Sequence, residues 1–130
     1  RTLHLRASGG TSLPPFSPGA HLQVSVPGLA DPRCYSLVTF DATPGAFEAP
    51  AEYRLGVRLE ADSSGGSRYM HGLVVGDRIT VKGPKNDFPL HPASPGEGEI
   101  VLIAGGIGIT PIAAMAAALQ SANRPYMLHY

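Results

Sequence analysis

A continuous apolar run leads directly into a glycine-rich loop in the last third of the chain. Residues 99–104 read as a buried strand, and residues 105–108 supply three glycines. Thr110 is predicted as the N-cap of the helix that follows, and Pro111 as its first residue, because both residue types favour those positions. This order presents backbone N–H groups and a helix N-terminus to a phosphate, so it predicts a nucleotide-binding site.

The same segment constrains the sheet that must surround it. A phosphate site of this type lies at the end of a parallel, doubly wound sheet. Residues 111–122 have the pattern of an alanine-rich helix, and residues 126–130 read as the next strand. Residues 97–130 therefore predict a first β-α-β unit. Because two strands and one helix cannot cover both faces of such a sheet, we expect this domain to be incomplete and the chain to be a fragment of a longer protein.

Alternating apolar and polar residues dominate the first half of the chain. Residues 20–26 and 53–59 each alternate in the manner of a half-buried strand. Further strands are predicted at residues 3–5, 35–40 and 78–82. Short strands at this spacing, separated by turns that contain Pro and Gly, are typical of an antiparallel barrel or sandwich.

Two segments interrupt the strand pattern. Residues 67–74 lack alternation and predict a short helix, and residues 84–98 read as a proline-rich loop. We expect the boundary between the two patterns in this loop. It divides the chain into domains at residues 1–96 and 97–130.

Composition narrows the possible functions. Ten basic and ten acidic side chains give a formal net charge of zero, which argues against nucleic-acid binding, an oligonucleotide-binding barrel included, and against a basic membrane-surface helix. The longest apolar run, residues 107–119, is interrupted and too short to span a bilayer. The five histidines have no metal-ligand spacing. The single cysteine, Cys34, is read as a small apolar filler, and a reducing, cytoplasmic setting is the default.

The first chemical motif is Arg33-Cys34-Tyr35-Ser36-Leu37. Arg33 and Tyr35 are two residues apart in a strand, so they share one face. An arginine fork suits a phosphate, and the face of a tyrosine suits a flat heteroaromatic ring. A surface arginine beside a half-buried tyrosine would give the same pattern, and spacing does not separate the two interpretations.

The second motif is Gly65-Gly66-Ser67, at the start of the predicted short helix. Two glycines allow close backbone approach to an anion, although a mobile linker would have the same composition. The glycine loop at residues 105–108 lacks the third glycine of a dinucleotide fingerprint, since Pro111 stands at that position. Its apolar residues Ile107 and Ile109, with Ile112 and Met115, are expected in the core.

Four motifs in this order resemble the ferredoxin-reductase-like flavoproteins, in the branch of the phthalate dioxygenase and vanillate demethylase reductases. They are R-x-Y-S-L at residues 33–37, G-G-S at 65–67, P-x-N-x-F-P-L at 84–90 and A-G-G-I-G-I-T-P at 104–111. The resemblance covers nearly the whole chain. It implies an all-β, antiparallel six-stranded flavin-binding barrel followed by the start of an α/β doubly wound NAD-binding domain.

The resemblance also implies roles for individual residues. Arg33 would bind the flavin phosphate, and Tyr35 would lie against the ring or the ribityl chain. The remaining flavin contacts would come from Ser36, Leu37, Gly56, Val57, Gly65, Gly66, Ser67 and Thr110. The nicotinamide dinucleotide would be held by Gly105, Gly106, Ile107, Gly108 and Pro111, with Thr110 close to where nicotinamide meets flavin. No side chain is needed as a general acid or base.

The implied activity is that of a reductase component. Members of this branch pass electrons from NADH through FMN to a [2Fe–2S] centre and on to a partner oxygenase. The iron–sulfur centre would lie in the full-length protein only. An FAD-dependent reductase of a cytochrome or ferredoxin is the first alternative, and a non-catalytic flavin-binding electron-transfer subunit is the second. NADH is expected over NADPH from the family alone.

Overall fold

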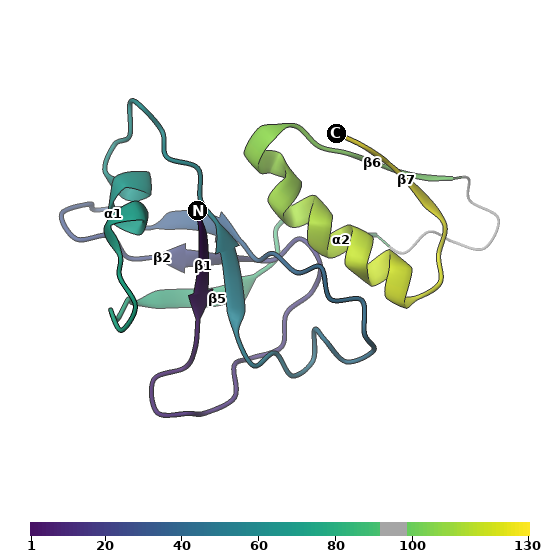
Figure 1. The fold of residues 1–130 in the computed structure, drawn as a ribbon, viewed down its shortest axis with the longest axis horizontal. Coiled ribbons are helices and arrows are strands. Elements are labelled where there is room, and N and C mark those ends of the chain that lie inside the picture. The colour runs from purple at the N-terminus through teal and green to yellow at the C-terminus, as the bar shows by residue number, and fades with distance from the viewer. Residues whose placement is uncertain (92–98) are drawn as a thin grey trace.

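The computed structural model describes residues 1–91 and 99–130, which form two units packed side by side (Figure 1). The first unit contains short antiparallel strands and one short helix, and the second contains a parallel β-α-β arrangement. The elements in chain order are β1 (Thr2–Leu5), β2 (His21–Val24), β3 (Arg33–Ser36), β4 (Tyr53–Gly56), α1 (Gly66–Gly72), β5 (Val81–Lys85), β6 (Ile100–Ile103), the 3₁₀ turn η1 (Gly106–Gly108), α2 (Ile109–Ser121) and β7 (Tyr126–His129).

β1 and β4 form a two-stranded antiparallel sheet. Leu3 lies opposite Leu55 on the buried face, whereas His4 lies opposite Arg54 on the exposed face. Successive side chains of a strand point to opposite faces, so alternation in the sequence becomes burial on one side. The strands predicted at residues 3–5 and 53–59 are confirmed, although β4 ends at Gly56.

β2 is the central strand of a three-stranded antiparallel sheet with β3 and β5. β3 begins at Arg33, which pairs with Val24, and ends at Ser36, so it lies earlier than the strand predicted at residues 35–40. β5 lies three residues later than the strand predicted at 78–82. Pairing with β2, rather than the pattern within each segment, sets these bounds.

One hydrophobic core joins the two sheets of the first unit. An isolated bridge connects Leu37 with Leu55, and both are fully buried with Leu22, Val24 and Met70. The antiparallel strands of the predicted barrel are present, but a closed barrel is not seen among the described residues. In the described part of this unit the five strands make sheets of two and three, and no closed ring of strands joins them. Turns containing Pro and Gly end strands after four or five residues, which leaves short ladders.

α1 confirms the short helix predicted over residues 67–74, with shifted ends. It begins at Gly66 and ends at Gly72, because Leu73 takes an extended conformation with φ −62° and ψ 141°. Met70 is fully buried and attaches the helix to the core of the first unit. The helix therefore has a fixed position against the strands.

The second unit has its own core. β6 and β7 pair in parallel, and α2 crosses over between them. Leu102 of β6 packs against one face of α2, made of Ile112, Met115 and Leu119. The predicted domain boundary at residues 96 and 97 lies outside the described residues. The first residues of the predicted loop 84–98 belong instead to β5.

The start of α2 differs from the prediction. Gly108 is the N-cap and Ile109 the first helical residue, so Thr110 is not the N-cap and Pro111 is the third residue of the helix. The reason is η1, whose carbonyl groups already accept the N–H of Ile109. The Thr110 hydroxyl donates to the Ile107 carbonyl oxygen at 2.9 Å. Proline is tolerated there because the first four N–H groups of a helix have no intrahelical partner.

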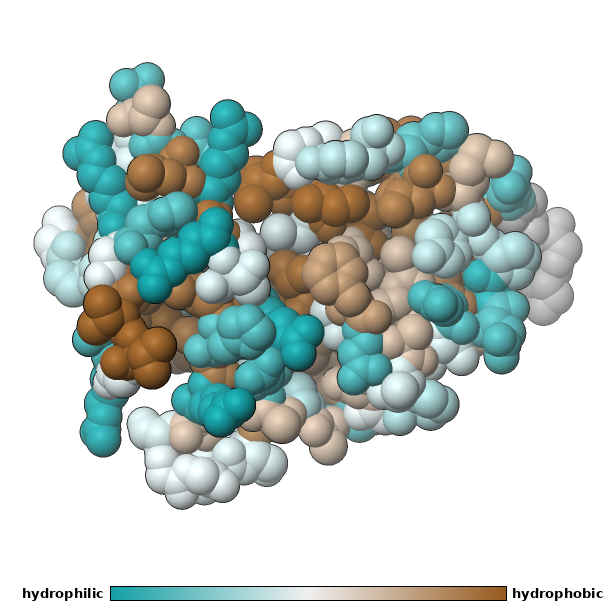
Figure 2. All heavy atoms as spheres, viewed as in Figure 1, coloured by the Kyte–Doolittle hydropathy of each residue, from teal (hydrophilic) through white to brown (hydrophobic). Residues whose placement is uncertain are grey.

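The face of β6 and β7 that points away from α2 carries exposed apolar side chains. Val101, Ile103 and Met127 are 49%, 73% and 42% exposed. Figure 2 shows hydrophobic atoms gathered over the part of the second unit where Figure 1 draws these strands. A parallel sheet is ordinarily covered on both faces. Neither described helix combines the length and the apolar character needed to cross a membrane.

Candidate functional site

A cavity of about 510 Å³ lies where β3, the end of β4, the start of α1 and the turn before α2 come together. Its volume falls within the range of small-molecule sites, roughly 300–1,000 Å³. The lining residues are Arg33, Cys34, Tyr35, Ser36, Gly56, Val57, Arg58, Glu60, Asp62, Ser63, Ser64, Gly66, Ser67, Ile107, Gly108, Thr110 and Pro111.

Arg33, Tyr35 and Gly66 converge on one wall of this cavity. A Cβ added to Gly66 would lie 2.8 Å from Cγ of Arg33 and 3.3 Å from the Tyr35 hydroxyl. The two side chains therefore share a face, as their spacing predicts, and both lie against the first residue of α1. A side chain at position 66 would occupy the space between them. The wall thus combines a guanidinium, an aromatic ring and a glycine without a side chain.

The Arg33 guanidinium keeps donors available for a ligand. Its Nη1 donates to the Asp31 carbonyl oxygen at 3.1 Å, and its Nη2 donates to Ser64 Oγ at 3.4 Å. A guanidinium has five N–H donors in a planar fork, so three are not used by these bonds. Both contacts are made at the protein surface and hold the fork at the mouth of the cavity.

Partial burial distinguishes Tyr35 from a surface tyrosine. Loss of hydration raises the pKa of its phenol, and the nearby positive charge of Arg33 partly opposes that rise. The phenol is therefore neutral at physiological pH. A neutral, half-buried ring offers a flat face and one hydroxyl to an aromatic ligand.

Short hydrogen-bonded turns shape the rim around α1. Ser67 Oγ accepts the Glu60 N–H at 3.1 Å, and Ser63 Oγ accepts the Gly65 N–H at 3.1 Å. Gly65 has φ +110°, a conformation that favours glycine. These bonds order a segment whose composition alone would also fit a mobile linker.

The opposite wall comes from the second unit. Thr110 approaches Gly56 so closely that a Cβ on Gly56 would lie 2.8 Å from its Cγ2. Ile107 also reaches this point, with Cδ1 at 4.0 Å from the same position. Gly56 therefore allows the start of α2 to contact the end of β4. Ile107 is 44% exposed and lines the cavity, so the expectation that it belongs to the core is wrong.

Most of the site residues predicted from the sequence line this cavity, but four do not. Leu37 is buried in the core and bridges to Leu55. Gly65 faces Leu29, whose side chain lies 3.7 Å from a Cβ built on it. Gly105 and Gly106 shape the turn that carries Ile107 and Gly108. The NAD and flavin roles of all these residues stay predictions.

The sequence motifs missed part of the lining. Arg58, Glu60, Asp62, Ser63 and Ser64 come from the segment between β4 and α1. A charged loop directly before G-G-S was a signal that could have identified them. The interpretation of Cys34 as a small apolar filler is wrong, because its side chain is exposed and lines the cavity.

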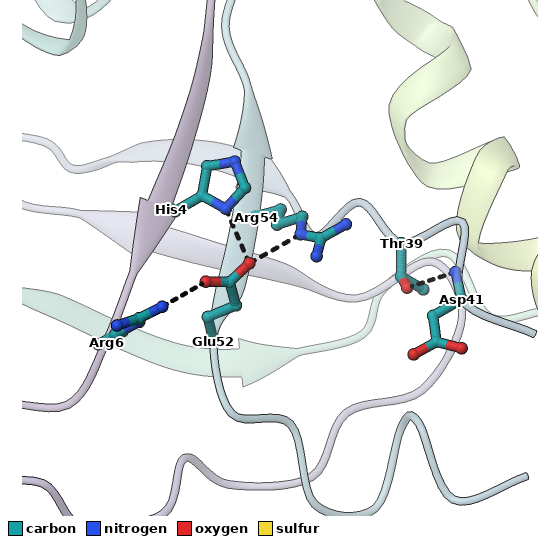
Figure 3. A network of polar contacts seen from close by, with 6 residues as sticks. All are labelled: His4, Arg6, Thr39, Asp41, Glu52 and Arg54. Atoms are coloured by element: carbon teal, nitrogen blue, oxygen red, sulfur yellow. Dashed lines mark hydrogen bonds and ion pairs between the residues drawn. The ribbon is translucent and has the colours of Figure 1, made fainter. Parts of the chain in front are cut away.

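A separate polar network covers the outer face of β1 and β4 (Figure 3). Glu52 accepts from His4 at 2.8 Å, from Arg54 at 3.0 Å and from Arg6 at 3.4 Å. Hydrogen bonds from His4 and then Arg54 lower the pKa of Glu52 to about 2. This network ties the two strands together. Within residues 1–91 and 99–130, no group of three His, Cys, Asp or Glu side chains is placed to hold a metal ion.

Comparison with known proteins gives consistent relatives. No protein-family model matches the chain. The chain is 40% identical over 131 residues to phenoxybenzoate dioxygenase subunit beta of Ectopseudomonas oleovorans. The aligned residues cover 97% of this chain and 37% of that protein. It is 42% identical over 127 residues to the vanillate O-demethylase oxidoreductase of Pseudomonas sp. strain HR199, with the same two coverages. The chain thus spans little more than a third of the length of these relatives.

Solved structures agree with the sequence relatives. Phthalate dioxygenase reductase, a modular structure for electron transfer from pyridine nucleotides to [2Fe–2S], superposes with a TM-score of 0.84 at 34% identity, over 99% of this chain and 38% of its own. The FAD/NAD-binding domain of nitric oxide dioxygenase from Vibrio cholerae superposes with a TM-score of 0.73 at 27% identity, over 94% of this chain and 51% of its own.

Proposed function

We propose that this chain belongs to the ferredoxin-reductase-like flavoproteins and is the flavin-binding part of a reductase component that serves a Rieske-type oxygenase. In this proposal NADH is the electron donor, and the acceptor is an iron–sulfur centre outside this chain. In the same proposal the two antiparallel sheets, with five described strands, belong to a six-stranded barrel domain over residues 1–96. The unit made of β6, α2 and β7 is the start of a doubly wound NAD-binding domain over residues 97–130.

One observation carries the proposal. The Arg33–Tyr35–Gly66 wall and the turn from Ile107 to Pro111 line the same cavity, although they come from different units. A flavin reductase needs such a junction, because the hydride donor and the flavin must meet face to face. The exposed apolar face of β6 and β7 is also what the start of a doubly wound sheet would present.

The residues present fit a flavin mononucleotide. The Arg33 fork suits a phosphate dianion, and Gly66, which lies against Arg33, and Ser67 line the same cavity. Tyr35 offers an aromatic face, Ser36 a hydroxyl, and the backbone at Gly56 and Val57 offers hydrogen-bonding groups to a planar ring. Gly65 and Leu37 would support this cradle from behind. Bound flavin would supply the exchange between two-electron and one-electron transfer, and the protein supplies position and electrostatics.

The glycine turn would hold the nicotinamide dinucleotide. Gly105, Gly106 and Gly108 keep the chain free of side chains in front of α2, and Ile107 and Pro111 bound the turn. The N-terminus of α2 favours a pyrophosphate through its N–H groups and dipole. Thr110 would lie where nicotinamide meets flavin, since it already contacts Gly56.

FMN is proposed over FAD because the branch of phthalate dioxygenase reductase is the nearer resemblance. The likeness to an FAD/NAD-binding domain keeps FAD as the alternative. Denaturing the purified holoprotein and separating the released flavin by chromatography distinguishes the two. We also propose a cytoplasmic location, since the exposed Cys34 thiol suits a reducing compartment.

Anaerobic mixing with NADH tests the reductase activity. We expect the visible absorbance of the bound flavin to bleach in the intact protein that contains this chain. An Arg33→Ala variant should lose flavin, whereas Arg78→Ala, at an exposed arginine that does not line the cavity, should not. Flavin that binds but stays oxidised under NADH would refute the reductase and favour a non-catalytic electron-transfer subunit.

A further inference from the structure

The segment after β5 connects the two units, and none of the proposed flavin or nicotinamide contacts involves it. Residues 86–90, Asn-Asp-Phe-Pro-Leu, leave the three-stranded sheet where Lys85 pairs with His21. They end at Leu90, which packs against the core of the second unit. We call residues 86–90 the clasp.

Asn86 fastens the clasp to the first unit. Its Nδ2 donates to Ser17 Oγ at 2.6 Å and to the Pro18 carbonyl oxygen at 2.9 Å. Its Oδ1 accepts the Phe88 N–H at 3.0 Å, which bends the chain into a local turn. One side chain thus both shapes the clasp and attaches it to the turn that precedes β2.

Gly19 provides the surface on which the clasp lies. It has φ +95°, and a Cβ built on it would lie only 1.8 Å from the Phe88 carbonyl oxygen. The Cε of Met115, from α2, would be 3.0 Å from the same Cβ. The backbone of the clasp and the middle of α2 therefore meet at a glycine that no other residue type could replace without displacing them.

α2 has a second contact with the first unit at Gly56, against Thr110. Thr110 and Met115 are five residues apart, which is about 7.5 Å along a helix axis. Two contacts at that separation fix the tilt of the helix as well as its distance from the sheets. The clasp controls one of them, and the cavity includes the other.

We propose that Asn86 is a positioning residue for hydride transfer. By holding the clasp against Ser17 and Pro18, it fixes α2 and hence the turn at Ile107 to Thr110 relative to the Tyr35 wall of the cavity. The separation between the hydride donor and the flavin is set in this way. This inference rests on the proposed function, since it concerns the same site.

Three variants separate positioning from other roles. Asn86→Ala removes all three hydrogen bonds. Asn86→Asp keeps an acceptor for the Phe88 N–H but turns a carboxylate oxygen toward the Pro18 carbonyl. Asp87→Asn is the matched control, because it changes the next residue of the clasp and breaks only the exposed ion pair between Asp87 and Lys85, the last residue of β5.

The geometry is measured with two spin labels and pulsed electron paramagnetic resonance. Lys82→Cys on β5 and Gln120→Cys on α2 place exposed labels on the two units, in a Cys34→Ser background. We expect one narrow distance distribution in the parent and in Asp87→Asn, and a broad one in both Asn86 variants. Should Asn86→Ala fail to fold, Ser17→Ala removes one acceptor and should give a smaller broadening.

Rapid-mixing kinetics in the native Cys34 background give the second readout. The rate of flavin reduction at saturating NADH should fall roughly 10- to 100-fold in Asn86→Ala, the order expected from a displacement of about 1 Å. Flavin affinity should stay unchanged in Asn86→Ala. If Asn86 had a purely structural role, flavin affinity would fall as well. Narrow distances and an unchanged rate in Asn86→Ala would overturn the inference, as would a loss of flavin affinity in step with stability. If NADH does not reduce the parent's flavin, the proposed function and the positioning role fail together, while the distances still decide whether the clasp holds the units.

Discussion

Replacing Arg33 with alanine removes a guanidinium from the wall of the cavity that we propose binds flavin. The side chain uses one donor on Asp31 and one on Ser64, the latter at a long 3.4 Å, so its remaining donors are available to a phosphate. A hydrogen bond to a charged group contributes about 1.5–3 kcal/mol. The partial exposure of Arg33 favours the lower half of that range. We therefore expect FMN affinity to fall roughly 10- to 40-fold, since each 1.4 kcal/mol is tenfold.

The assay is a titration of the flavin-free protein with FMN, followed by the quenching of flavin fluorescence. Arg33→Lys keeps the charge without the planar fork and should fall between the parent and Arg33→Ala. Arg78→Ala should bind as the parent does. Because the two existing hydrogen bonds of Arg33 are made at the surface, the free energy of unfolding measured with denaturant should change little in Arg33→Ala. Equal FMN affinity in Arg33→Ala and the parent would remove this residue from the site.

Three further changes have defined outcomes. Gly56→Ala should lower the free energy of unfolding by about 1–3 kcal/mol in denaturant titrations, because its Cβ would crowd Thr110 at 2.8 Å; an unaltered midpoint would contradict the close contact. Tyr53→Phe should cost about 1 kcal/mol in the same assay, through loss of the hydrogen bond to the Pro14 carbonyl. Glu52 has a pKa of about 2 against an ordinary 4.5, so the stability that it contributes is present above pH 4.5 and is lost as pH falls toward 2. Because its partners are exposed, this loss should be at most about 1 kcal/mol, and Glu52→Gln should abolish this pH dependence of the free energy of unfolding.

Local alternation predicted much of the fold, and strand pairing decided the rest. Leu3, Leu22 and Leu55 are buried where the two-residue period placed them. The bounds of β3 and β5 depend on their register with β2. Residues 25–32 separate that strand from β3 and residues 25–80 separate it from β5, so the pattern within each segment could not set these bounds. The cap of α2 was mispredicted because η1 runs directly into the helix, so Ile109 is already its first residue and Thr110 lies within its first turn.

The site was predictable where its residues share one strand. The common face of Arg33 and Tyr35 follows from their spacing, and the approach of both side chains to Gly66 confirms it. Arg58 and Asp62 were missed because the path of an exposed loop depends on tertiary contacts such as the bond from the Glu60 N–H to Ser67. The function of Asn86 was equally invisible, since its partners Ser17 and Pro18 precede it by almost seventy residues.

Flavin binding in the cavity is tested directly by mapping the backbone amide shifts in the nuclear magnetic resonance spectrum during titration with FMN. At 13.5 kDa the chain suits this measurement. We predict that the largest changes fall on the two walls of the cavity, at residues 33–36, 56–67 and 107–110, with saturation at one FMN per chain. Shifts confined to the outer face of β1 and β4, or no saturable shift at all, would contradict it.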